Sequence, residues 1–302
     1  MTTFGYTVEA PTPWPELLDV ARELDQHSNF DSFWIADSLV PNGPLDDPKL
    51  ETYTALAAVA HSTSRIRLGV HVTGLPYRHP AVLAKIVTTI DHISGGRVEL
   101  GIGAGWPGEN RRFGIEFWKR RERVERLDEA LQVIKLLWTQ PHPTFEGRYY
   151  RLDGPPFTPA NVQQPHPPVL IGGGSDAMLR VMAKHADMVS PMIAIADAKA
   201  KIDAYAREFG RDPSRIRWEG GGLLFIHDDP LVVERVLRYA MEQYSQTEEQ
   251  VRAGLFGSFD DVRAAVRRQI NDGADDINLF QLPRVHTQSL LRFSEEVIPQ
   301  FR

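Results

Sequence analysis

Two glycine-rich turns stand where buried strands are expected to end. The first, residues 103 to 108 (GAGWPG), follows an apolar run that begins at Val98, and the second, residues 172 to 175 (GGGS), follows one that begins at Val169. Glycine lacks a Cβ, so a flat group can approach the backbone closely. Consecutive backbone N–H groups before a helix bind anions such as phosphate. The turns therefore predict a site for a flat group and, at residues 172 to 175, a phosphate.

The first turn also matches G-x-G-x-x-G, the pattern that opens a dinucleotide site in a βαβ unit. That interpretation requires a turn after the first strand, a long helix directly behind it and an acidic residue about 20 positions later. Three predicted strands precede this turn, and the segment after Gly108 contains Gly114 and no sustained helical stripe. We therefore favour glycines at a strand end of a barrel. Relief of crowding at the barrel wall, and an ordinary tight turn at residues 172 to 175, are the structural alternatives.

Apolar runs alternate with helical patterns along the whole chain, which is typical of parallel βα units. The predicted strands are Phe4 to Val8, Ser32 to Ile35, Ile66 to Val72, Val98 to Ile102, Val169 to Ile171, Asp187 to Val189, Gly222 to Ile226 and Asp276 to Phe280. The predicted helices are Trp14 to Gln26, Glu51 to Ser62, Pro80 to Ile93, Arg123 to Trp138 and one that begins at the N-cap Ser258. This pattern predicts one domain, residues 1–302, folded as a (β/α)8 TIM barrel with insertions.

Two stretches interrupt the alternation. Residues 139 to 168 are rich in proline and predict an insertion with a small hairpin around Glu146-Gly147. Residues 228 to 258 predict a second insertion before the last helix and strand. Neither contains a motif that identifies a substrate.

Composition limits the possible functions. The 302 residues carry a net charge of −6 with scattered basic residues, so we expect no nucleic-acid partner. The chain has no cysteine, which excludes disulfides and thiolate chemistry. No run reaches about 18 apolar residues and the start lacks the features of a signal peptide. These features predict a soluble, cytoplasmic protein with no membrane partner.

Other barrel chemistries find little support. Where metal-dependent barrel hydrolases have H-x-H at the first strand, this chain has Val8-Glu9-Ala10, and it contains no H-E-x-x-H, so we predict no metal site. No G-x-S-x-G sequence marks a hydrolase nucleophile. Asp37 and Glu109 could serve as the facing carboxylates of a glycosidase, but nothing in the sequence sets their separation.

Several blocks, in order, resemble the bacterial luciferase-like family, and most closely its deazaflavin (coenzyme F420)-dependent oxidoreductase branch. The blocks are VTGLPYRHPAVLAKIVTTIDHISGGRVELGIGAGW (72–106), FGIEFWKRRERVERLDEALQVIKLLW (113–138), FEGRYY (145–150), QPHPPVLIGGGSDAMLRVMAKHADMV (164–189) and, more weakly, FGSFDDVRAAVRRQINDGADDINLF (256–280). They are specific for the superfamily and much less specific for flavin against deazaflavin.

The resemblance implies a barrel that binds its cofactor at the C-terminal ends of the strands. The family has a bulge with a non-prolyl cis peptide behind the isoalloxazine ring, and its place here is His71-Val72. The cofactor phosphate of the family binds after the fifth strand, which corresponds to the GGGS turn. The implied cofactor-binding residues are His71, Val72, Thr73, Gly103, Ala104, Gly105, Gly172, Gly173, Gly174 and Ser175. For His71, a satisfied core histidine is an equal alternative.

The implied catalytic residues are Asp37, Trp106 and Glu109. Asp37 matches an acidic residue beside the ring. Deazaflavin members often place His after it, whereas this chain has Ser38. Trp106 occupies the position of a catalytic Glu in sugar-phosphate members, and Glu109 follows three positions later. A solvated loop carboxylate is the alternative for Glu109.

The resemblance implies an oxidoreductase that transfers a hydride between coenzyme F420 and an unidentified small organic substrate. The alternatives are an FMN-dependent monooxygenase that uses reduced flavin and oxygen, and a barrel that binds flavin without turnover. A flavin or F420 reductase would be a possible redox partner. The family commonly forms homodimers, for which the apolar residues Leu56, Val59 and Ile86 are candidates, although core packing explains them equally well.

Overall fold

The computed structural model describes residues 1–9, 12–41, 47–244, 247–280, 282 and 287–302. Within these residues, parallel strands close into a barrel of eight. Their order is β1 (Thr3–Val8), β2 (Ser32–Ile35), β3 (Arg67–Val70), β5 (Val98–Gly103), β8 (Val169–Gly173), β9 (Met188–Pro191), β10 (Arg217–Ile226) and β12 (Asp276–Phe280). Strand β12 pairs with β1 and closes the ring, with Thr3 opposite Asp276. The predicted (β/α)8 barrel is confirmed.

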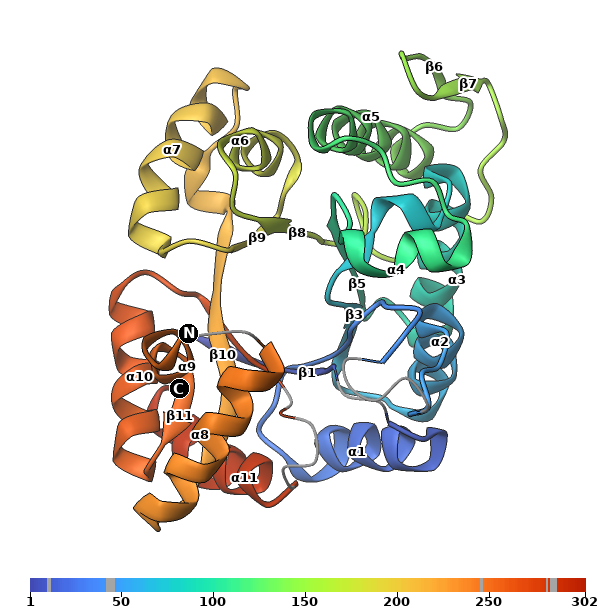
Figure 1. Ribbon diagram of the computed structural model, residues 1–302. Helices are drawn as coiled ribbons and strands as arrows, with labels where there is room; N and C mark the ends of the chain where they lie inside the picture. The colour runs from blue at the N-terminus through green and yellow to red at the C-terminus, as the bar shows by residue number, and fades with distance from the viewer. Residues whose placement is uncertain (10–11, 42–46, 245–246, 281, 283–286) are drawn as a thin grey trace.

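Helices surround the strands, and in Figure 1 their colours follow the chain around the barrel. They are α1 (Trp14–His27), α2 (Thr52–Ser62), α3 (Pro80–Ser94), α5 (Arg120–Thr139), α6 (Asp176–His185), α7 (Ile195–Glu208), α10 (Phe259–Asn271) and α11 (Thr287–Arg292). The chain ends in a π-helical turn, η4 (Phe293–Val297), and a 3-10 turn, η5 (Ile298–Gln300). Helix α10 begins as predicted, because Ser258 and Asp261 form a capping box. None of the described helices is long and apolar enough to cross a membrane.

Short strands and helical turns lie next to the ends of the barrel strands. They are β4 (Thr73–Gly74), η1 (Leu75–Tyr77), α4 (Pro107–Asn110), η2 (Arg111–Phe113) and η3 (Pro213–Arg215). The first insertion contains β6 (Thr144–Glu146) and β7 (Arg151–Asp153), which pair antiparallel and confirm the predicted hairpin.

The second insertion is more regular than the sequence predicted. It contains α8 (Pro230–Tyr244), α9 (Glu248–Ala253) and β11 (Leu255–Gly257), and β11 pairs with the end of β10. The predicted seventh strand, Gly222 to Ile226, was too short, because β10 begins at Arg217. Glu219 and three glycines obscure the apolar pattern there. A side chain at Gly221 would place its Cβ 1.8 Å from the carbonyl oxygen of Asn278, so the barrel requires glycine at this position.

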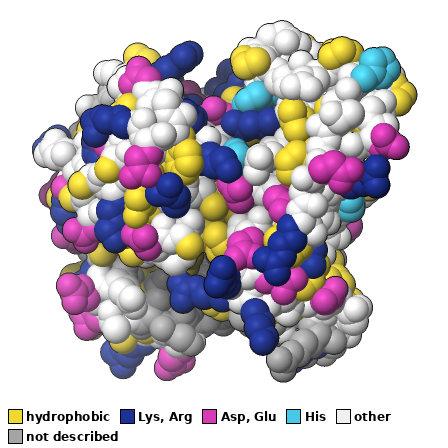
Figure 2. Space-filling view, turned by 90° about the horizontal axis from the view of Figure 1, so that it is seen from above, with side chains coloured by type: hydrophobic (Ala, Val, Ile, Leu, Met, Phe, Trp, Pro, Cys, Tyr) yellow, Lys and Arg dark blue, Asp and Glu magenta, His cyan; other side chains and the backbone are white. Residues whose placement is uncertain are grey.

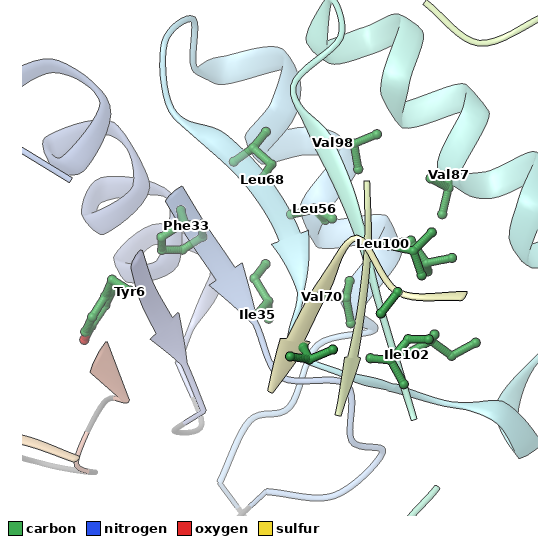
Figure 3. Close-up of a cluster of buried hydrophobic side chains, with 14 of the residues drawn as sticks. Tyr6, Phe33, Ile35, Leu56, Leu68, Val70, Val87, Val98, Leu100 and Ile102 are labelled. Carbon is green, nitrogen blue, oxygen red and sulfur yellow. The ribbon is translucent and has the colours of Figure 1, made fainter. Parts of the chain in front are cut away.

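A hydrophobic layer separates the strands from the helices. Figure 3 shows side chains of neighbouring strands, among them Phe33, Leu68 and Leu100, with Leu56 of α2 and Val87 of α3. Leu56 and Val59 are completely buried in this layer. The suggestion that they belong to a dimer surface is therefore wrong, since they cover the barrel. Figure 2 shows acidic and basic side chains intermixed on one face of the molecule.

Candidate active site at the strand ends

The chain is bulged where β3 ends. The peptide bond between His71 and Val72 is cis, as the resemblance implied, and the strand resumes as β4, whose Thr73 and Gly74 pair with Ile102 and Gly103. The side chain of Val72 lies over the ends of two further strands. A Cβ on Gly103 would be 3.2 Å from Val72 Cγ2, and a Cβ on Gly172 would be 3.5 Å from it. Val72, Gly103 and Gly172 therefore form one surface, which we call the glycine surface.

The turn at residues 172 to 175 leads directly into a helix. Ser175 is the N-cap of the ten-residue helix α6, and its hydroxyl accepts a hydrogen bond from the backbone of Met178 at 3.4 Å. Such a helix N-terminus favours an anion. Gly174 approaches Met192, since a Cβ at Gly174 would lie 3.1 Å from Met192 Cβ. The turn thus joins the glycine surface, through Gly172, to the N-terminus of α6.

Backbone angles and contacts within the protein account for glycine at two of the predicted positions, 105 and 173. Gly105 has φ of 89°, and a Cβ there would lie 2.7 Å from Pro76 Cδ. Gly173 has φ of 150°, and its Cβ would meet Met178 Cγ at 3.1 Å. The expectation that a Cβ at Gly105 is excluded by a cofactor is therefore unnecessary. The carbonyls of Ala104 and Gly105 accept hydrogen bonds from Arg123 at 3.2 and 2.6 Å.

Asp37 follows β2 and is buried in a hydrogen-bonded group. Its side chain is 1% exposed and accepts from the Thr73 hydroxyl and from both terminal nitrogens of Arg78, at 2.6 and 3.3 Å. Arg78 also contacts Glu51 and lies over the ring of Tyr53, 4.6 Å from its centroid. The structure thus brings together the predicted residues Asp37 and Thr73, and adds Arg78, which the sequence reasoning did not select although it lies within the first quoted block.

Glu109 is buried, so the alternative of a solvated loop carboxylate is wrong. It is 5% exposed and accepts from the backbone N–H groups of Leu39 and Val40, at 2.7 and 2.9 Å, and from the hydroxyl of Tyr77. Burial, together with Glu109, raises the pKa of Tyr77. These contacts fix the loop after β2 against the segment after β5.

Trp106 does not share this environment. Its side chain is 72% exposed, and its carbonyl accepts from Asn110 Nδ2 at 2.7 Å. The structure therefore leaves the ring of Trp106 at the surface, outside the buried groups around Asp37 and Glu109. Its catalytic assignment stays a prediction, as do those of Asp37 and Glu109.

Lys49 is a further group that the sequence reasoning missed. Its Nζ donates to the carbonyl of Ala36 at 3.1 Å, and the Thr52 hydroxyl donates to the same oxygen at 3.1 Å. Burial lowers the pKa of Lys49, and the nearby carboxylates, Asp37 first among them, oppose that change. Among the described residues, no three His, Asp or Glu side chains converge as a metal site would require.

His71 is also held from inside the barrel. Its Nε2 lies 2.8 Å from Glu219 Oε1, and Asn278 Nδ2 donates to Glu219 Oε2 at 3.2 Å. Neither Glu219 nor Asn278 was selected from the sequence. A polar residue inside the predicted strand Asp276 to Phe280 was the signal available for Asn278. Glu219 lay outside every predicted strand.

Comparisons of the sequence and of the fold with known proteins point to the same family. The profile of the luciferase-like monooxygenase family matches residues 1–286. An F420-dependent glucose-6-phosphate dehydrogenase of Kineococcus radiotolerans is 29% identical, and the alignment covers 99% of this chain and 96% of that protein. An FMNH(2)-dependent dimethylsulfone monooxygenase of Pseudomonas putida is 30% identical over 60% of this chain and 50% of that protein. A solved F420-dependent secondary alcohol dehydrogenase in complex with an F420-acetone adduct has a TM-score of 0.88 at 20% identity, covering 100% of this chain and 99% of that one.

Proposed function

Because this chain belongs to the luciferase-like monooxygenase family, we propose that it is an oxidoreductase that transfers a hydride between coenzyme F420 and a small organic substrate. The relative aligned over almost the whole chain, a glucose-6-phosphate dehydrogenase, uses F420, which supports this choice of cofactor. One structural observation supports the proposal: the glycine surface continues directly into the turn at residues 172 to 175, which leads into the N-terminus of helix α6.

The residues present fit a deazaflavin. A ring would lie against Val72 and the backbone of Gly103 and Gly172, where Val72 is the nearest side chain to both glycines. Gly173, Gly174 and Ser175 precede a helix N-terminus suited to its phosphate. The bound cofactor would supply the hydride chemistry, while the protein supplies position and electrostatics. Asp37, fixed by Arg78 and Thr73, would lie beside this surface because Thr73 follows Val72 directly.

An FMN-dependent monooxygenase is the second candidate, and the Pseudomonas putida relative favours it. FMN also combines a flat ring with a phosphate, so both cofactors suit the same surface and turn. Titration of the purified protein with F420 and with FMN, each oxidised and reduced, separates the two. Tighter binding of F420 is expected. Tighter binding of FMN would favour the monooxygenase, and binding without turnover of any substrate would favour a non-catalytic barrel.

Gly172→Ala tests the ring surface. A Cβ at Gly172 meets Val72 only at an ordinary contact of 3.5 Å, so the protein should fold normally. The substitution adds a methyl group beside Val72, on the surface proposed for the ring. We expect F420 affinity to fall by about 1 to 3 kcal/mol, the range for overpacking a filled site. A truncated cofactor with the ring and no phosphate should lose as much. Unchanged affinity for both would reject the ring position.

Ser175→Gly is the matched variant for the phosphate. Glycine is tolerated at an N-cap at a cost of a few tenths of a kcal/mol, so the helix should persist. We expect weaker binding of whole F420 and unchanged binding of the truncated cofactor. An equal loss for both cofactors would show that residues 172 to 175 do not bind the phosphate.

We also propose a homodimer and a reductase that supplies reduced cofactor, both on family resemblance. Leu56 and Val59 cannot form the dimer surface, because they are buried in the barrel layer. Sedimentation at micromolar concentration that shows only a 34.1 kDa species would reject the dimer.

A further inference from the structure

Glu9 follows β1, and its side chain points toward the barrel axis. Val8 of β1 pairs with Ile35 of β2, and both are buried beneath the helices. Successive side chains of a strand point to opposite faces, so Glu9 shares the inner face with Thr7, whose hydroxyl donates to Asn278 at 3.1 Å. Thr7 is completely buried, whereas Glu9 is partly exposed. The carboxyl group of Glu9 therefore lies where the barrel opens.

The same rim of the barrel carries the residue directly before the glycine surface. The strands stay in register beyond their paired ends, because the N–H of Ala36 donates to the Val8 carbonyl and the N–H of His71 donates to the Ile35 carbonyl, both at 3.0 Å. Glu9, Ala36 and His71 thus form one row across the ends of β1, β2 and β3. The methyl group of Ala36 is the only side chain between the other two, so Glu9 lies close to the glycine surface.

The surroundings of Glu9 favour its protonated form. Burial raises the pKa of Glu9 above its ordinary value, and the positive charges of His71 and Lys49 only partly oppose this. Lys49 also faces Asp37 and Glu109, so it does not act on Glu9 alone. The two neighbours are linked, since ionised Glu9 raises the pKa of His71. Glu9 thus holds a proton to higher pH than an exposed glutamate, and two cations stabilise the carboxylate that remains when the proton leaves.

The other carboxylates and the tyrosines at this rim are poorer acids. Asp37 accepts from Arg78, and Glu109 accepts from two backbone N–H groups and from Tyr77. Neither carboxylate can bind a proton without weakening these contacts. Burial raises the pKa values of Tyr53 and Tyr77, which makes both hydroxyls weaker acids.

His71 and Lys49 are engaged as well. The Nε2 of His71 lies 2.8 Å from Glu219 Oε1, and the imidazole also hydrogen-bonds the backbone of His71 itself, so both ring nitrogens are occupied. The Nζ of Lys49 donates to the carbonyl of Ala36 at 3.1 Å. Glu9 is therefore the group at this rim that is best placed to exchange a proton with a ligand.

We propose that Glu9 is the acid of this site, and that its carboxyl group binds the oxygen of a carbonyl substrate and protonates it as the substrate is reduced. This inference rests on the proposed function. The carbonyl carbon gains a hydride, with its electron pair, from the reduced deazaflavin, and the former C=O π pair takes the proton of the Glu9 carboxyl group. The products are an alcohol, oxidised deazaflavin and the Glu9 carboxylate, which Lys49 and His71 stabilise until solvent reprotonates it.

Calorimetry of ketone binding to the complex with oxidised F420 tests this assignment without turnover. A ketone oxygen only accepts hydrogen bonds, so the parent should bind cyclohexanone and acetone at least about fivefold more weakly once pH passes the pKa of Glu9, the effect of one unpaired polar group. Glu9→Gln keeps a donor that does not titrate, so its affinity should stay constant with pH. Asp128→Asn, a matched control between α5 and α6, should behave as the parent. The same pH dependence in the parent and in Glu9→Gln would overturn the proposal.

Turnover of cyclohexanone separates hydrogen bonding from proton transfer. Glu9→Gln should reduce kcat by at least about 100-fold with little change in KM, whereas Glu9→Leu should impair both. In the parent, kcat/KM should fall as pH rises through the pKa of Glu9. Lys49→Met removes a charge that lowers this pKa, so the fall should move to higher pH. A Lys49→Met variant that loses proton transfer, while Glu9→Gln keeps it, would assign the acid to Lys49 and overturn the proposal.

Failure of this proposal is distinguishable from failure of the proposed function. A parent that does not bind F420 refutes the proposed function. A parent that binds F420 and neither ketone refutes only the carbonyl substrate and the role of Glu9. Carbon-13 NMR of the Glu9 carboxyl group in the free protein should give a raised pKa, and a higher one in Lys49→Met. An ordinary pKa in both proteins would overturn the role of Glu9 without any ligand.

Discussion

Two buried histidine–carboxylate pairs in the described part of the chain have the same separation, but the pKa values of their histidines shift in opposite directions. His71 Nε2 lies 2.8 Å from Glu219 inside the barrel, and His185 Nε2 lies 2.8 Å from Asp128 between α6 and α5. The histidine side chains are 11% and 7% exposed. Yet the pKa of His71 is raised, whereas burial lowers the pKa of His185.

The difference comes from the neighbouring charges. Around His71 a second carboxylate, Glu9, adds to the effect of Glu219. Around His185 two cations, Lys184 and Lys135, add to the effect of burial, and Lys184 shares Asp128, its Nζ being 2.9 Å from Asp128 Oδ2. A short hydrogen bond to a carboxylate therefore does not determine the charge of a buried histidine. The surrounding charges decide between an imidazolium and a neutral ring.

The largest expected effect is the loss of folding stability when the carboxylate of each pair, Glu219 or Asp128, is replaced by its amide. Glu219 is 4% exposed and Asp128 is 28% exposed. Removing one partner of a buried pair typically costs about 3 to 5 kcal/mol, and His71 can reduce this cost by releasing its proton, so we expect about 2 to 3 kcal/mol for Glu219→Gln at about pH 6. Solvent screening should limit Asp128→Asn to about 1 kcal/mol or less. Urea unfolding measures both. Equal losses would show that the two pairs do not differ in energy.

The second prediction concerns the pH dependence of each histidine's contribution. The pKa of His71 is raised in the folded state, so its stabilisation is present below its unfolded pKa of about 6.5 and is lost as pH rises through the folded pKa. His185 has a lowered pKa, so stability is lost as pH falls below about 6.5. Relative to the parent, His71→Gln should be more destabilised at about pH 5.5 than at about pH 8.5, and His185→Gln the reverse. The same sign for both variants would contradict the comparison.

The pair inside the barrel also marks the limit of the sequence reasoning. The apolar runs predicted the barrel, and the family resemblance placed the cis peptide at His71-Val72. The contact between Glu219 and His71 could not be predicted from the sequence, because the two residues are 148 positions apart and meet only once the barrel has closed. The glycines that follow Glu219 also obscured its strand. Likewise, Gly105 could not be assigned to its contact with Pro76 without knowing how the loop after β5 folds back.

A third prediction separates His71 from a neighbouring group whose contribution has the same sign. Burial raises the pKa of Asp276 to about 7, and the guanidinium of Arg217 only partly opposes this. A carboxyl with a raised folded pKa stabilises below its unfolded pKa, and that contribution is lost as pH rises through 7. The parent should therefore lose about 1 kcal/mol more than Asp276→Asn between about pH 6 and about pH 8. Urea unfolding at both pH values measures the difference. Parallel pH profiles would show that Asp276 is ionised throughout, leaving His71 to account for any loss.

The smallest effect tests whether cations keep His185 neutral. Lys184→Met removes one positive charge beside His185 and one competing cation from Asp128, and both changes favour the protonated ring. Burial is the largest cause of the lowered pKa, so the pKa of His185 should rise toward its ordinary value without reaching it. Lys184 and Asp128 are 33% and 28% exposed, so stability should change by only about 0.2 to 1 kcal/mol. NMR titration of the histidine ring protons measures the pKa in the parent, in Lys184→Met and in Lys201→Met, a control whose lysine pairs with Asp176 instead. A pKa of His185 that stays the same or falls in Lys184→Met would mean that burial alone separates His185 from His71, and the charge explanation would have to be abandoned.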